Sequence, residues 1–397
     1  MPFGWVDFSK DDRNKVLAVL DLLSEPGTLD ELGIGAIRDG FSNLFFPGTS
    51  TIQTRAKYFL IVPYILRDLE RNKEQNPKKI LDLLFKEERA CCEVFVKKHK
   101  DELGIIGGRS IHNAGWIKRT PADIYWAGMR QYGIFLDDKL SLSEYIYTTC
   151  SLKRQKSGMK NLGSGNDNRD EGITDDLCAG VQNGPRFWNI PTYNSDWKEH
   201  LGMRLTSDEA LFLKKQIIHS FPDSMLAYFL KNDMSEVLEA ENYFDLMDFL
   251  SGAPAEMREA YTRGWKFNKF LYIIRVFYND IVSDGQNKGA TDEIKRLRSD
   301  FKYYANIDIE EIMKYLGVSR EINLKSFLHN AKFCLLAGNI EGLKSCIVKR
   351  EISLKGESRA RTNHPGEENA AGWFGGGFLD YRFGAAKTIM RDIFESE

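Results

Sequence analysis

The sequence contains few of the residue patterns that mark metal or redox chemistry. None of its six cysteines forms a Cys-x-x-Cys pair, and no group of histidines lies near them to complete a zinc site. The six histidines are isolated along the chain, which is typical of surface or core residues. We therefore expect reduced, mostly buried thiols and predict no bound metal ion and no cofactor.

Long apolar runs are also missing. The longest ones, YFLIVPYIL and FLYIIRVFY, fall well short of the roughly 20 residues that span a bilayer. The N-terminus, MPFGWVDFSKDD, lacks the basic start and apolar run of a signal peptide. The sequence thus predicts a cytoplasmic protein with no membrane contact.

The chain has no excess of charge of one sign. Its 55 Lys and Arg residues against 57 Asp and Glu residues give a formal net charge of −2. That balance does not indicate a strongly basic nucleic-acid protein, although a local basic patch matters more than the total. A content of 42% hydrophobic and 28% charged residues favours a globular chain over a disordered one.

Catalytic signatures are absent from the sequence. It has no Gly-Lys-Ser/Thr phosphate loop, no Gly-x-Ser-x-Gly, no His-Glu-x-x-His and no Gly-x-Gly-x-x-Gly after a strand. Adjacent carboxylates, such as Asp137 and Asp138, occur in polar contexts typical of exposed faces. We name no catalytic residue, while a metal-dependent nuclease assembled from distant residues stays open.

At 397 residues the chain is too long for one ordinary core, and its composition suggests four segments. Residues 1–152 form a first helical domain, and the Gly- and Asn-rich residues 153–185 form a polar linker or mobile loop. Residues 186–345 form a second helical domain. Residues 346–397 hold a basic arm, a short strand and a closing helix. The predicted fold is mainly α, with small β elements in the first block and the tail.

Several helices can be placed from their end signals. Thr120 can cap a helix that has Pro121 at its first position and ends at Gly133. Thr206 and Glu209 have capping-box spacing. An amphipathic helix is expected through RNKVLAVLDLL, with Ser9 and Asp12 as a plausible cap. The alternating stretch FLDYRF predicts the short strand of the tail.

The stretch FFPGTSTIQTRAKYFLIVPYIL raises a question about anion binding. A Pro47–Gly48 turn precedes a Ser50 or Thr51 cap, and Arg55 and Lys57 follow within the first two turns of the expected helix. Cations at a helix N-terminus interact unfavourably with the helix dipole, and a nearby anion would compensate for this cost. The anion can be a bound phosphate, or an acidic side chain such as Asp30 or Asp39.

Two other basic clusters could contact phosphate. Lys118 and Arg119 directly precede the Thr120 cap, and the basic arm near the C-terminus carries several cations separated by small polar residues. A plain solvated loop explains the arm equally well. The predicted nucleic-acid-binding residues are Arg55, Lys57, Lys118, Arg119, Lys355, Arg359 and Arg361.

Three blocks of the chain resemble one uncharacterised prokaryotic family, a domain of unknown function. They are DELGIGAIRDGFSNLFFPGTSTIQTRAKYFLIVPYIL, the block GIIGG…KRTPADIYWAGMRQYGI and the tail GWFGGGFLDYRFGAAKTIMRDIF. The resemblance implies no activity or active site. It implies a setting near helicase-like and phospholipase-D-like genes of phage-defence islands.

These observations predict an accessory factor that is not an enzyme. Our leading hypothesis is a nucleic-acid-associated protein of a phage-defence or mobile-element system that contacts the phosphates of double-stranded DNA or RNA. The first alternative is a helical adaptor that docks a helicase or nuclease partner without touching nucleic acid. The second is the unrecognised metal-dependent nuclease.

Overall fold

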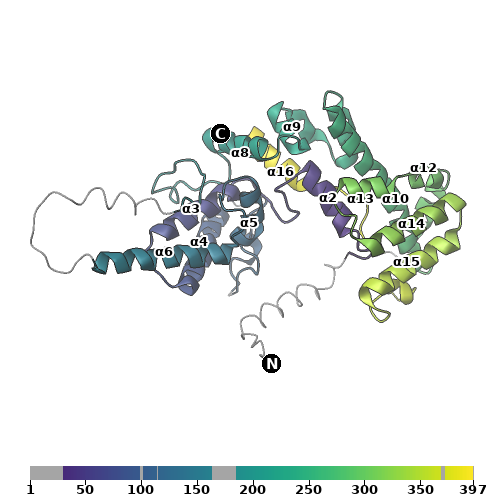
Figure 1. Ribbon diagram of the computed structural model, residues 1–397, viewed down its shortest axis with the longest axis horizontal. Coiled ribbons are helices and arrows are strands. Elements are labelled where there is room, and N and C mark those ends of the chain that lie inside the picture. Colours follow the sequence, from purple (N-terminus) through teal and green to yellow (C-terminus); the bar gives the residue numbers. More distant parts are fainter. Residues whose placement is uncertain (1–29, 99–101, 114, 163–184, 368–371, 397) are drawn as a thin grey trace, which may run out of the picture. The chain divides into compact units, whose positions relative to one another are not determined.

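The computed structural model describes residues 30–98, 102–113, 115–162, 185–367 and 372–396, without the side chains of residues 158–162 (Figure 1). Within these residues the chain is built from helices and connecting turns. Contacts divide it into two compact units. The first unit contains the chain up to Phe41 together with Arg258–Tyr381, and the second contains Ser42–Met257 and Arg382–Glu397. Each unit therefore combines segments that are distant in sequence.

The core of the second unit is helix α3, whose first nine residues, 58–66, are all buried. Both α4 and α5 pack against α3, and α6 packs against α4 and α5. An aromatic cluster lies beside them, made of Trp126, Phe135, Tyr145, Phe187 and Trp188. The helices of this unit are α3 (Tyr58–Arg71), α4 (Pro77–Lys98), η1 (Gly108–Ser110), α5 (Pro121–Gln131), α6 (Leu142–Leu162), α8 (Ser207–Ser220), α9 (Met225–Lys231), η2 (Ser235–Glu239), η3 (Tyr243–Leu250) and α16 (Phe383–Phe394).

The first unit is organised around α10 (Ala255–Val282) and a hairpin of α14 (Ile322–Ala337) and α15 (Ile340–Lys355), which lie side by side (Figure 1). Gly338 ends α14 with φ +68, and the Asn339 side chain caps α15 by accepting from the Gly342 N–H. Two helices cross the boundary between the units, namely α10 and α2 (Gly35–Phe45). The other elements are α11 (Lys288–Leu297), α12 (Phe301–Ala305), α13 (Ile309–Tyr315) and η4 (Arg361–Asn363).

The prediction of small β elements is wrong for the described residues. They contain no strand, only one isolated bridge between Phe135 and Trp188. The tail has no regular structure at Phe374 and Leu379, where side chains of α10 satisfy its backbone. Asn279 bonds both the N–H (2.6 Å) and the C=O (2.9 Å) of Phe374. Asn268 does the same for Leu379, at 2.8 and 2.6 Å. These amides take the place of a neighbouring strand, which the alternating pattern could not reveal.

The helix-end predictions at Thr120, Thr206 and Gly133 are confirmed. The cap expected at Ser50 or Thr51 is wrong, because residues 50–57 lie outside any helix and α3 begins only at Tyr58, without a side-chain cap. Thr120 and Thr206 each form a capping box, with Asp123 and Glu209 respectively. Gly133, with φ +61, follows α5. The stretch SEVLEAENYFDLMDFLSG forms the 3-10 helices η2 and η3. The helix expected through RNKVLAVLDLL lies outside the described residues.

Two of the three segment boundaries expected from composition, after residues 152 and 345, fall inside helices. α6 continues to Leu162, so residues 153–162 of the expected linker are helical, whereas residues 163–184 lie outside the described part. α15 runs across the expected boundary at residue 345. No helix among the described residues is long and apolar enough to cross a membrane.

Candidate functional site

The signature stretch that ends at Arg55 is a series of turns bound to α5. The Gly48 N–H donates to Gln131 Oε1 at 2.7 Å, and the Tyr132 hydroxyl donates to the Pro47 carbonyl at 2.8 Å. The Tyr125 hydroxyl accepts from the Arg55 N–H at 3.0 Å and donates to its carbonyl at 2.7 Å. Two of the blocks that carry the family resemblance are therefore packed on each other.

The positive charge of Arg55 is neutralised by two acidic side chains of the protein itself. Arg55 Nε lies 2.9 Å from Asp392 Oδ1 and its Nη1 lies 2.6 Å from Glu102 Oε2. The Ala56 N–H donates to Asp392 Oδ2 at 2.7 Å, so a carboxylate of α16 occupies the approach to α3. An acidic side chain was one of the two anions expected beside Arg55, but the carboxylates that pair with it are not those of Asp30 or Asp39.

Lys57 is also paired inside the second unit. Its Nζ lies 2.5 Å from Glu209 Oε2, and both side chains are about nine-tenths buried. Glu209 is the same residue that closes the capping box of α8 by accepting from the Thr206 N–H at 2.9 Å. The pair joins the start of α3 to the start of α8 and leaves Lys57 facing protein rather than solvent.

The expected basic arm is largely folded onto the first unit. Lys355 is the last residue of α15, is buried and pairs with Glu351 at 2.8 Å and with Glu31. Burial lowers the pKa of Lys355 to about 8. Arg361 Nη1 lies 2.5 Å from Glu31 Oε1. Arg359 is exposed, and its Nε donates to the Lys355 carbonyl at 3.0 Å.

Lys118 and Arg119 are exposed in the bend before α5, as the sequence led us to expect of a surface pair. Beside them lies Glu88 of α4, which is 2% exposed and accepts from the Ala122 N–H at 2.6 Å. Burial raises the pKa of Glu88 to about 8, although that N–H bond opposes the shift. The first turn of α5 thus already has an acidic side chain.

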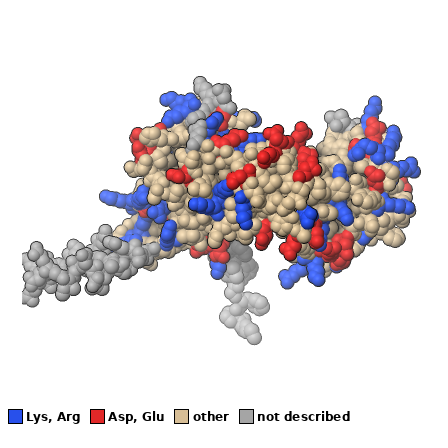
Figure 2. All heavy atoms as spheres, turned by 90° about the horizontal axis from the view of Figure 1, so that it is seen from above, with Lys and Arg blue, Asp and Glu red and all other residues tan. Residues whose placement is uncertain are grey.

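The predicted binding residues do not converge into one anion site within either unit. Arg55, Lys57, Lys355 and Arg361 are neutralised by carboxylates and help to hold distant segments together. On the face shown in Figure 2, basic and acidic side chains are interspersed. In the part of the chain that the structure describes, no group of three or more His, Cys, Asp or Glu side chains is placed to hold a metal ion.

A groove between α14 and α15 is the feature that the sequence analysis missed. It encloses about 620 Å³ and is lined only by residues of these two helices. Phe327 lies in its floor and is buried, whereas Phe333 and Leu354 line it while 70% and 39% exposed. An aromatic side chain this exposed, beside a groove, is an unpartnered apolar surface.

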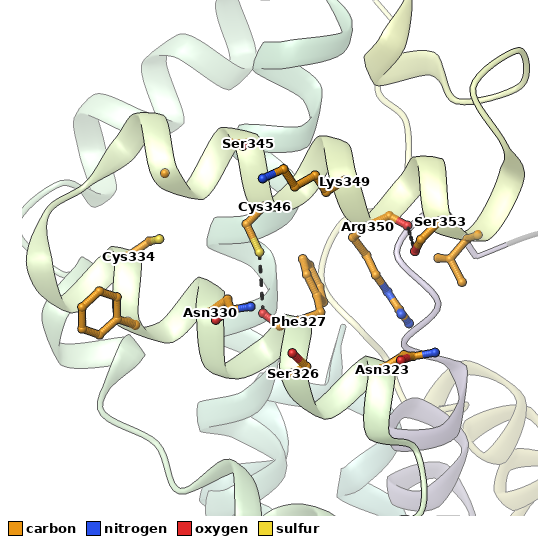
Figure 3. A pocket seen from close by; sticks show the side chains of 13 residues that line it. Asn323, Ser326, Phe327, Asn330, Cys334, Ser345, Cys346, Lys349, Arg350 and Ser353 are labelled. Carbon is orange, nitrogen blue, oxygen red and sulfur yellow. Dashed lines mark hydrogen bonds between the residues drawn. The ribbon is translucent and has the colours of Figure 1, made fainter.

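The rest of the lining is polar or basic. Asn323 and Asn330 belong to α14 and Ser345 to α15, and Lys349 and Arg350 supply positive charge (Figure 3). The Arg350 guanidinium lies 5.5 Å from the centre of the Phe327 ring. No acidic side chain is among the described residues that line the groove. The groove is therefore suited to an apolar ligand that also carries negative charge.

A signal of this groove was present in the sequence of α14. Its buried residues include Phe327, Leu328, Ala331 and Leu335, and Phe333 falls outside that stripe. An apolar residue off the buried face of a helix indicates a second contact surface. The sequence alone could not identify this surface, because that requires the boundaries of α14 and the position of α15 beside it.

Comparisons with known proteins add a family only for the N-terminal part. No curated protein matches the chain, and no solved structure matches it either. Residues 2–166, however, match the model of a family that is described only as a family of unknown function (DUF6361).

Proposed function

We propose that this chain is a non-enzymatic helical adaptor that binds a helical segment of a partner protein in the α14–α15 groove. The observation that carries the proposal is the exposure of Phe333 at the edge of that groove. A phage-defence or mobile-element setting, with a helicase-like or nuclease partner, remains part of the proposal.

The dimensions of the groove support a helix as its ligand. α14 and α15 have 16 residues each, which corresponds to about 24 Å. A helix of three or four turns lying along them would place apolar residues at three- and four-residue spacing against Phe327, Phe333 and Leu354. Fully burying a phenylalanine side chain stabilises a complex by about 1.5–3 kcal/mol.

The charge of the lining determines which helix is preferred. Lys349 is exposed and Arg350 is buried among the lining residues. A partner helix with carboxylates beside its apolar stripe would complement them, whereas a basic helix would be repelled.

A pair of designed peptides tests this proposal with the full chain. Both are 16-residue helices with the same leucine stripe, one flanked by Glu and the other by Lys, and binding is measured by fluorescence anisotropy. We expect the Glu peptide to bind and Phe333→Asp to weaken binding about tenfold or more, or ~1.4 kcal/mol.

Ile322→Asp is the matched control. Ile322 belongs to the same helix and is 74% exposed, but it does not line the groove, so its replacement should leave the affinity unchanged. Equal binding of the two peptides, or equal effects of the two substitutions, would contradict the proposal.

A second candidate is the nucleic-acid-associated accessory factor, which the exposure of Lys118, Arg119 and Arg359 supports. These side chains could contact phosphates without reading bases. Binding to double-stranded DNA should then weaken with salt, and Arg119→Ala should reduce the salt slope by about 1. The absence of DNA and RNA binding at low salt would exclude this candidate.

A further inference from the structure

We propose that residues 9–24 of the same chain bind in the α14–α15 groove and compete there with the partner helix. The competition rests on the proposed function, because it regulates the same site. The binding of residues 9–24 can be tested without any partner or peptide, because the groove and the segment belong to one chain.

The first argument is the place where the described residues begin. Arg350, which lines the groove, donates from Nε to the Leu32 carbonyl at 2.9 Å and from Nη2 to the Gly33 carbonyl at 3.2 Å. A Cβ atom on Gly33 would lie 2.9 Å from Cδ1 of Leu354, another lining residue. The chain therefore passes the end of the groove at residues 32–33, and Arg350 points toward it (Figure 3).

The second argument is the sequence pattern of the preceding residues, which lie outside the described part. Val16, Val19, Leu20 and Leu23 recur at three- and four-residue spacing, the pattern that a helix-binding groove accepts. Asp12 precedes Val16 by four residues and would share its face, so the stripe also has a carboxylate. This combination of apolar and acidic residues matches the lining.

The third argument is the short connection. Residues 24 and 30 are separated by only five residues, and Pro26–Gly27 among them favours a turn. A short connection gives an effective concentration in the millimolar range. An intrinsic affinity of only about 0.1 mM would then fill the groove in about nine of ten molecules and weaken an external ligand about tenfold.

The test compares substitutions in the full chain by their affinity for the Glu-flanked designed peptide. Leu20→Asp places a charge in the apolar stripe and should tighten peptide binding about tenfold. Ala18→Asp, on the opposite face of the expected helix, should leave the affinity unchanged. Equal affinities for wild type and Leu20→Asp would show that the segment does not compete.

A second readout does not depend on any external ligand. Cys346 lines the groove and is half-buried, with its Sγ 3.8 Å from the Phe327 carbonyl oxygen. A docked segment should protect this thiol, so its alkylation, followed by mass spectrometry, should be about tenfold faster in Leu20→Asp than in wild type or Ala18→Asp.

The two readouts separate the two proposals. If the designed peptide binds but neither its affinity nor the Cys346 rate responds to Leu20→Asp, only the binding of residues 9–24 is refuted. If the peptide fails to bind to any variant while Cys346 is still protected, the adaptor function is refuted and the intramolecular contact stands.

Discussion

Replacing Gly128 by alanine would change the stability of the second unit in opposite directions through helix propensity and through tertiary packing. The sign of the measured change shows which effect is larger. Gly128 is an interior residue of α5, where alanine is favoured over glycine by about 1 kcal/mol. A methyl group there would lie 2.5 Å from the carbonyl oxygen of Gly48 and 2.8 Å from Cε1 of Phe59. Overpacking of this kind costs about 1–3 kcal/mol. Because a backbone atom and a buried ring must both move, we take the upper value and expect a net loss of about 2 kcal/mol.

Hydrogen exchange followed by mass spectrometry is the appropriate assay, since the two units need not unfold together. Gly128→Ala should lose protection in residues 46–57 and 121–132, which form the contact. Gly35→Ala is the matched control, because its new methyl group would meet nothing closer than 3.5 Å. If Gly128→Ala were as protected as wild type, or better, the packing of α5 on the signature turn would be refuted.

Three further predictions concern buried polar groups. Because the pKa of Glu88 is raised to about 8 in the folded protein, folding takes up a proton at pH values between the usual carboxyl pKa, near 4.3, and 8. The stability it contributes is complete below that value and is lost as the pH rises through 8, by about 1.4 kcal/mol per unit. Glu88→Gln should flatten this slope in urea titrations at pH 5 to 8, and an unchanged slope would contradict the assignment. Lys57→Met should destabilise the second unit by about 3 kcal/mol by leaving Glu209 unpaired, and adding Glu209→Gln should restore part of it in thermal melts. Asn279→Leu removes both partners of Phe374 and should increase proteolysis of the tail, whereas proteolysis at the wild-type rate would show that these bonds do not hold it.

Several predictions that depended only on neighbouring residues were successful, although the cap expected at Ser50 or Thr51 was not. A capping box such as Thr120 with Asp123 is completed within four residues, so the sequence contains both partners. The mainly helical architecture follows from apolar spacing within single helices and was predicted correctly. The predicted strand FLDYRF failed because the backbone of Leu379 pairs with the Asn268 side chain of α10, 111 residues earlier in the chain.

The function of the cations depended on distant residues. The sequence analysis placed Arg55 and Lys57 in the first two turns of a helix and suggested a nearby phosphate or carboxylate. The structure places both residues just before α3, with acidic side chains beside them. The sequence could not identify Asp392, which is 337 residues from Arg55. Nor could the sequence show that Glu209 forms an ion pair with Lys57 in addition to its bond in the capping box of α8.

The sequence by itself determined the mainly helical architecture and several helix ends, such as those at Thr120 and Thr206, because these depend on interactions within a few residues. It also suggested that the charge at residues 55–57 is compensated. Only the tertiary structure decided which carboxylates compensate that charge and which apolar side chain stays uncovered. The exposure of Phe333 depends on how α14 and α15 pack together, and no local pattern specifies that arrangement.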